Sequence, residues 1–229
     1  MRRMAMQYLH KVDIVDCKHH HDGTWFMIRV PDWFAEIEKI PKEAELRLND
    51  GRSISVKQRM FIYALFGDIR KATGQPINQI KETLKTYFVE EFECKPFSLS
   101  DVDMTTAREF IEHTLSFMFE YDIPLSPKVH ALAKEVNNYL YLCLIHRKCA
   151  ACGKKADIHH VDAVGMGRDR TKIDHTKHRL IALCSKKCHK EAHDIGWITF
   201  KEKHHVDGIK VNQETVKKLE YRSDKNVYH

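Results

Sequence analysis

A chain of 229 residues, 43% of them hydrophobic, can bury one large core or two small ones. No stretch reaches the roughly 18 consecutive apolar residues that a membrane-spanning helix needs, and polar residues from Gln7 onward interrupt any apolar segment of a signal peptide, so we exclude a membrane protein and expect a cytoplasmic one. The formal net charge of +6 is unevenly placed: residues 146–229 carry 19 Lys and Arg against 11 Asp and Glu, whereas residues 1–145 carry 19 against 21.

The N-terminal part of the sequence shows the alternation of apolar and polar residues that is typical of strands. We expect two strands at about 4–15 and 25–30, joined by a polar turn at 17–23. A third strand is expected at 45–48, where it ends at the Asn49-Asp50-Gly51 turn.

Helical spacing of the apolar residues follows this turn. Four helices are expected: one capped by Ser53 or Ser55 and ending at Gly74, one from about Pro76 to Glu93, and two that begin near Ser100 and Ser126. The last helix leads into Cys149 without a linker. The sequence therefore predicts an α+β fold with two domains, residues 1–145 and 146–229.

Two cysteine pairs lie in the basic C-terminal third. Cys149 and Cys152 form a CxxC pair that is followed by Gly153, a sequence typical of a turn, and Cys184 and Cys188 lie further along the chain. Thiolates at such spacing can hold one Zn²⁺ from a tight turn, and a second pair completes a closed tetrahedral site. We predict a structural Zn²⁺ on these four cysteines. The alternative is four buried cysteines without a metal.

Four histidines accompany the cysteine pairs. His189 and His193 are four residues apart on an expected helix, so they share one face. His159 and His160 are neighbours on an expected strand and point to opposite sides, so only one of them can join the helical pair on a cation. We assign His159, His189 and His193 as metal ligands and His160 as a general base for phosphodiester hydrolysis. Alternatively, these histidines belong to a core or to a second structural zinc site.

These motifs together resemble the HNH endonucleases over about residues 149–197. The matching motifs are the CxxC pair, Asp157-Ile158-His159-His160, Leu183-Cys184, Cys188-His189 and His193. The resemblance implies a ββα-metal fold and metal-dependent cleavage of DNA. It places a ligand of a catalytic cation (Mg²⁺, Mn²⁺, Ni²⁺ or Zn²⁺) at His159 and the base at His160.

One signature position departs from that family. The middle Asn, which holds the loop between the two strands and so orients the base, is replaced by Arg179, with His178 beside it. Either side chain could donate a hydrogen bond instead, so Arg179 is a second candidate catalytic residue. If the loop is not held, the unit binds DNA without cutting it.

The basic C-terminal third is typical of proteins that bind a polyanion, because Lys and Arg contacts to phosphate release counterions. The same charge also occurs on solvated surfaces that only keep a protein soluble. We predict DNA backbone contacts at Lys154, Lys155, Arg168 and Arg170, on or near the loop between the strands.

The segment before this unit resembles the phage lambda Orf (NinB) recombination mediators over about residues 46–125. The matching motifs are Arg52-Ser53-Ile54-Ser55, Lys57-Gln58-Arg59 and the helix through 64–69. The resemblance implies a homodimer that binds single-stranded DNA and cooperates with the single-strand-binding protein. Arg52, Lys57 and Arg59 begin a helix, where phosphate can approach. The alternative is an ordinary capped helix whose basic residues face water.

Two functions follow. The first is a phage-type recombination protein, acting in the cytoplasm of a bacterial host cell if a phage or prophage encodes it, that cuts single-stranded or branched DNA. The second is a non-catalytic mediator that binds single-stranded DNA and uses the HNH unit as a zinc-stabilised DNA-binding module. Cleavage in the presence of a divalent cation distinguishes them.

Overall fold

A computed structural model of the chain describes residues 13–29, 52–162 and 174–225. The elements in these ranges are, in chain order, β1 (Asp13–His20), β2 (Gly23–Arg29), α1 (Val56–Thr73), α2 (Ile77–Phe92), α3 (Met104–Glu120), α4 (Pro127–Ala133), α5 (Tyr139–Ile145), β3 (Asp157–His160), the 3-10 turn η3 (His175–Lys177), β4 (Leu180–Leu183), the π turn η4 (Ser185–His189), α6 (Lys190–Ile195), α7 (Trp197–His204) and α8 (Gln213–Lys225). They form the α+β fold that the sequence predicts. None of the helices in the described ranges has the length and apolar character required to cross a bilayer.

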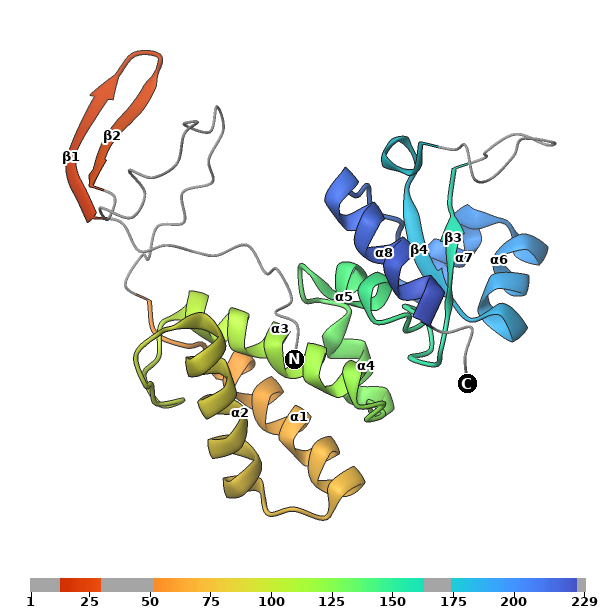
Figure 1. Cartoon of the computed structure of the whole chain (residues 1–229), viewed down its shortest axis with the longest axis horizontal. Coiled ribbons are helices and arrows are strands. Elements are labelled where there is room, and N and C mark those ends of the chain that lie inside the picture. Colours follow the sequence, from red (N-terminus) through yellow and green to blue (C-terminus); the bar gives the residue numbers. More distant parts are fainter. Residues whose placement is uncertain (1–12, 30–51, 163–173, 226–229) are drawn as a thin grey trace.

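The strands β1 and β2 form an antiparallel hairpin, with Asp13 opposite Arg29 and His20 opposite Gly23. It lies apart from the helices in Figure 1. The turn predicted at residues 17–23 is shorter in the structure. The first strand continues to His20 and the second begins at Gly23, so the turn contains only two residues. The strand expected at 45–48 lies outside the described residues.

The ends of the first three helices follow local sequence signals. Ser55 caps α1 through a capping box, in which its side chain accepts from the Gln58 N–H and the Gln58 side chain accepts from the Ser55 N–H. Gly74 ends this helix in the left-handed conformation, at φ 74°. Both predicted ends of α1 are confirmed. Helix α3 begins later than predicted, because Asp103 is the residue whose carboxylate accepts from the free N–H groups of the first turn.

The helix expected after Ser126 is two helices, α4 and α5. The chain leaves the helical path after Ala133 and resumes it at Tyr139, across a segment that contains Asn137 and Asn138. Asparagine favours turns because its side chain competes for backbone hydrogen bonds. The break changes the packing partner: α4 contacts α1, whereas α5 contacts β4.

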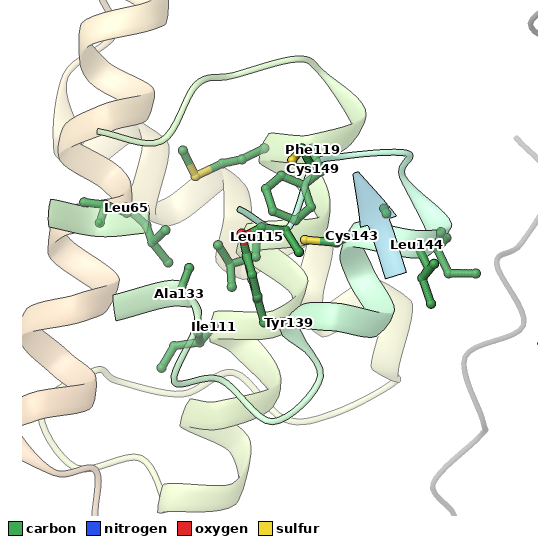
Figure 2. Close-up of a cluster of buried hydrophobic side chains, with 14 of the residues drawn as sticks. Leu65, Ile111, Leu115, Phe119, Ala133, Tyr139, Cys143, Leu144 and Cys149 are labelled. Atoms are coloured by element: carbon green, nitrogen blue, oxygen red, sulfur yellow. The ribbon is translucent and has the colours of Figure 1, made fainter. Parts of the chain in front are cut away.

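One hydrophobic core joins the helices to the first cysteine turn. Figure 2 shows buried side chains from α1, α3, α4 and α5 gathered with Cys149: Leu65, Ile111, Leu115, Phe119, Ala133, Tyr139, Cys143 and Leu144. The Tyr139 hydroxyl donates to the Ala150 carbonyl at 3.1 Å, and its oxygen lies 2.8 Å from Nε2 of His130. The C-terminal unit is thus packed against the helices, and the division at residue 145 stays a prediction.

Candidate active site

The C-terminal unit is built on a short antiparallel hairpin followed by a helix. In this hairpin Asp157 of β3 lies opposite Leu183 of β4, and His160 lies opposite Leu180. All four residues of β4 are buried, and the chain continues through η4 into α6. This is the ββα arrangement that the motifs predict, and it positions two clusters of side chains that could hold a metal ion.

The first cysteine pair lies in a tight turn beside β4. The Gly153 N–H donates to the Cys149 carbonyl at 2.7 Å, and Gly153 adopts φ 73°, which glycine permits without strain. The Ala150 N–H donates to the Ala182 carbonyl at 2.9 Å. That hydrogen bond fixes the turn against β4 and directs Cys149 toward the second pair.

The second cysteine pair is separated by a π turn. The His189 N–H donates to the Cys184 carbonyl at 3.0 Å, which closes a turn one residue wider than an α-helical turn. The extra residue accounts for the CxxxC spacing of this pair. It also places Cys188 directly before His189, so that neighbouring residues belong to different clusters.

The sulfur cluster has the donor chemistry of a zinc site. The Sγ atoms of Cys149, Cys152, Cys184 and Cys188 all lie within 4.8 Å of one another, and none is in a disulfide. The Cys152 and Cys184 sulfurs are 3.6 Å apart, far beyond a disulfide bond of about 2.05 Å. Zn–S bonds of about 2.3 Å in a tetrahedron require sulfurs about 3.8 Å apart. Burial raises the pKa of Cys149 to about 11, so a thiolate there needs a cation beside it. These residues fit a structural Zn²⁺.

The second cluster contains three imidazoles. The ligand atoms of His159, His189 and His193 lie within 4.8 Å of one another. The Nε2 atoms of His189 and His193 are 3.1 Å apart, and the His159 ring is centred 4.5 Å from that of His189. The structure therefore brings together the three residues that strand alternation and helical spacing select. Their role as ligands of a cation stays a prediction.

The surroundings of His159 favour its neutral form. Burial, and then the positive charge of His189, His193 and His160 when protonated, lower the pKa of His159 to about 4. At neutral pH its imidazole keeps the lone pair that a metal ligand must offer. The indole of Trp197 lies beside the His159 ring, with the ring centroids 6.2 Å apart.

His160 points to a different group of side chains. Its Nε2 atom lies 2.9 Å from Nδ1 of His175, and the two rings are stacked at 5.1 Å. The His178 ring is centred 5.9 Å from that of His160. Asp174 caps the turn η3, where its carboxylate accepts from the Thr176 N–H at 3.1 Å. Sequence reasoning missed His175, although the density of histidines before β4 was a signal.

Arg179 holds the segment that follows β3. Its Nη2 and Nε donate to Oδ1 of Asp162 at 2.7 and 3.1 Å, and its backbone N–H donates to Oδ2 at 2.7 Å. Nη1 donates to Asp207 at 3.2 Å. These hydrogen bonds from Arg179 lower the pKa of Asp162 to about 2. The guanidinium thus ties down the chain two residues after His160.

A third backbone segment lies beside the hairpin. Leu180 and Ile209 exchange two hydrogen bonds, from N–H to carbonyl in each direction, at 2.8 and 2.9 Å. A Cβ atom on Gly208 would lie 2.6 Å from Cγ2 of Val161 and 2.9 Å from Cβ of Arg179. Only glycine lets this segment approach the end of β3 so closely.

The predicted DNA contacts of the C-terminal unit fall into two groups. Lys154 and Lys155 are exposed beside the first cysteine turn. Arg168 and Arg170 lie outside the described residues. The sequence prediction for these four residues stays open.

The predicted contacts near α1 differ among themselves. Lys57 forms an exposed ion pair with Glu135 at 3.1 Å. Arg52 is exposed before the helix, whereas Nε of Arg59 is buried. Arg59 lines a cavity.

Comparison with known proteins agrees with this geometry. Residues 34–222 match the family described as "Putative HNHc nuclease". No curated protein and no solved structure gives a significant match. The matched range includes α1, α2 and α3, and the comparisons show no relation to the Orf or NinB proteins. The chain belongs to the HNHc nuclease family.

Proposed function

We propose that the protein hydrolyses phosphodiester bonds of DNA, with His160 as general base and with His159, His189 and His193 as ligands of a divalent cation. The observation that carries the proposal is the separation of the two strand histidines. His159 converges with the helical pair, whereas His160 lies against His175. One strand therefore presents both a ligand and a base to a substrate.

A divalent cation bound by the three imidazoles would supply positive charge to the scissile phosphate and to the leaving oxygen. His160 acts on the attacking water. Its Nε2 atom lies 2.9 Å from Nδ1 of His175, which holds the ring in place. His160 takes a proton from that water as the general base.

His175 and Arg179 act through His160 and are positioning residues. His175 fixes the tautomer and the ring direction of His160 through the 2.9 Å contact. Arg179 holds Asp162, and thereby the end of β3, from the position that Asn occupies in other HNH nucleases. The replaced Asn is thus compatible with cleavage.

The test is incubation of the purified protein with single-stranded, branched and plasmid DNA in the presence of Mg²⁺, Mn²⁺ or Ni²⁺. We expect cleavage with at least one cation, and a loss of about 10²- to 10⁴-fold in rate for His160→Ala. The circular dichroism melting curve of the variant should match that of the wild type. Unchanged cleavage by His160→Ala would reject the assignment of the base.

The replaced Asn also favours a second function. In it the protein is a recombination mediator that binds single-stranded DNA as a homodimer, together with the single-strand-binding protein, and the zinc-stabilised HNH unit only grips the strand. Gel shifts on single-stranded DNA without cleavage under any cation would support this function. Nicking that depends on His160 would exclude it.

A further inference from the structure

A cavity of about 210 Å³ lies away from both clusters, between the start of α1, the middle of α2 and the loop before α3. Its lining residues are mostly cationic or hydroxyl-bearing: Arg59, Tyr63, Lys81, Lys85, Ser98, Leu99 and Ser100. No residue proposed for cleavage lines it. The helices α1 and α2, which carry most of these residues, lie in the lower part of Figure 1. Helix α6, which carries His193 of the imidazole cluster, lies on the right.

The cavity has more positive than negative charge. Lys81 and Lys85 share one carboxylate, that of Glu82, at 3.2 and 3.5 Å. The Glu82 side chain is 62% exposed, whereas those of Lys81 and Lys85 are only 26% and 19% exposed. Asp101, at the rim, accepts from the Ser100 hydroxyl at 3.3 Å. Three cations thus face two solvated carboxylates.

One of the residues that line the cavity is an arginine, Arg59. Its Nε is buried and has no hydrogen-bond partner among the residues that the structure describes, so the hydrogen bonds of this guanidinium are not all made within those residues. A guanidinium donates to phosphate oxygens with good geometry, so an anion in the cavity can accept from Arg59.

The other lining side chains indicate the chemical class of the ligand. Nζ of Lys85 lies over the Phe97 ring, 5.7 Å from its centroid, so this ammonium is held in place. The hydroxyls of Ser98 and Ser100 lie 2.9 Å apart. Guanidinium, ammonium and hydroxyl groups are the donors that contact phosphates in complexes with nucleic acids. The volume is below the roughly 300 Å³ of the smallest pockets for drug-sized ligands, which favours a single phosphate over a whole nucleotide.

Tyr63 completes the site at its edge. Its side chain is 42% exposed, and its ring packs edge-on against Phe66 with centroids 5.6 Å apart. The ring is thereby supported from the core and open toward the solvent. Aromatic rings in this situation stack on bases next to a bound phosphate.

We propose that this cavity binds a backbone phosphate of the nucleic-acid strand, at a point distant from the bond that is cut, while Tyr63 stacks on a neighbouring base. The identity of the ligand rests on the proposed function. The anion chemistry rests on the cavity alone. The site anchors the strand on the helices.

The first test compares two double variants in the background of His160→Ala, without added divalent cation, so that no cleavage occurs. Lys81→Gln with Lys85→Gln removes two cavity cations. Lys95→Gln with Lys128→Gln removes two exposed lysines outside the cavity and is the matched control. Binding of a labelled single-stranded oligonucleotide is followed by fluorescence anisotropy across a salt series. The slope of log K against log salt is negative, and its magnitude should decrease by about 1 in the cavity variant, as expected for the loss of one phosphate contact. It should change less in the control.

A second variant leaves the lysine packing untouched. Ser100→Asp places a negative charge at the exposed rim of the cavity and should weaken binding severalfold by repulsion, whereas Ser100→Ala should have a small effect. Unlabelled single-stranded DNA, duplex DNA and inorganic phosphate serve as competitors of the labelled oligonucleotide. We expect single-stranded DNA to compete best. Competition by phosphate alone, or equal salt slopes in the cavity variant and its control, would overturn the proposal.

The two proposals can fail separately. A protein that binds through this cavity but never cuts DNA contradicts the proposed function and leaves the phosphate site intact. A protein that cuts DNA through His160, and whose cavity variants bind as the wild type does, contradicts only the phosphate site.

Discussion

The sulfur cluster and the imidazole cluster meet at Cys188 and His189, which are adjacent in the chain, yet their surroundings differ. Cys188 is buried and lies at the end of a π turn, whereas His193 is exposed and His159 is half-buried. A closed sulfur site keeps a turn in shape, and a partly open imidazole site leaves room for a substrate. One turn thus serves both clusters: the backbone that closes the sulfur cluster also directs His189 into the imidazole cluster.

The largest effect on stability is expected from a substitution in the sulfur cluster. Cys188→Ser should abolish binding of the structural metal, whose apparent free energy in small zinc domains is about 10–16 kcal/mol. This is comparable to the whole stability of a domain, so the C-terminal unit should unfold. Zinc content and thermal melting measure the result. Cys17→Ser, at an exposed position of β1, should retain both the metal and the melting temperature.

A change beside the base tests the imidazole side. His175→Ala should lower the cleavage rate by about 10- to 100-fold, less than His160→Ala, because His175 only orients the base. His175→Asn, which keeps a hydrogen-bonding group near Nδ1, should recover part of the rate. A shift of the pH profile of cleavage in the Ala variant, at unchanged melting temperature, distinguishes positioning from a structural role.

Removal of one ligand tests whether the clusters are independent. His193→Ala should lower the divalent metal bound per chain from about two ions to about one, because the four sulfurs remain. The protein should stay folded and lose cleavage. Loss of both ions in this variant would mean that the imidazole cluster also maintains the fold.

A smaller effect is expected where the backbone approaches the hairpin. Gly208→Ala should cost about 1–3 kcal/mol, since its Cβ would clash with Val161 and Arg179. Gly67→Ala is the control, because Gly67 lies within α1 and has open space around its Cα. That substitution should stabilise the protein by about 0.5–1 kcal/mol. Chemical denaturation measures both.

The smallest effect is a pH dependence close to the sulfur cluster. Burial, and then the positive charge of Lys134, lower the pKa of His130 to about 4, whereas an unfolded His titrates near 6.5. Between these values the unfolded state binds more protons, so stability decreases as the pH falls from about 6.5 to about 4. His130→Gln should weaken this dependence by about 1 kcal/mol across the window, because half-burial limits the effect. An identical slope of stability against pH in both proteins would contradict the assignment.

The sequence predicts those features that depend on neighbouring residues. The cap at Ser55, the end of α1 at Gly74 and the convergence of His159 with the helical pair follow from capping rules and from the periods of strand and helix. The break between α4 and α5 does not follow from local rules alone, because Asn137 and Asn138 favour a turn without requiring one. It also depends on the two helices having different packing partners. The contact joins His160 to His175, 15 residues later in the chain, and local rules do not predict contacts between residues so far apart.

The helix α5 covers β4, and all four residues of that strand are buried. The same helix belongs to the core that includes α1 and α3. The helices that carry the proposed phosphate site and the unit that carries the proposed cleavage residues are therefore packed together in one hydrophobic core. Replacing the helices by another domain would expose the buried residues of β4, so the helices and the hairpin would have to be exchanged together.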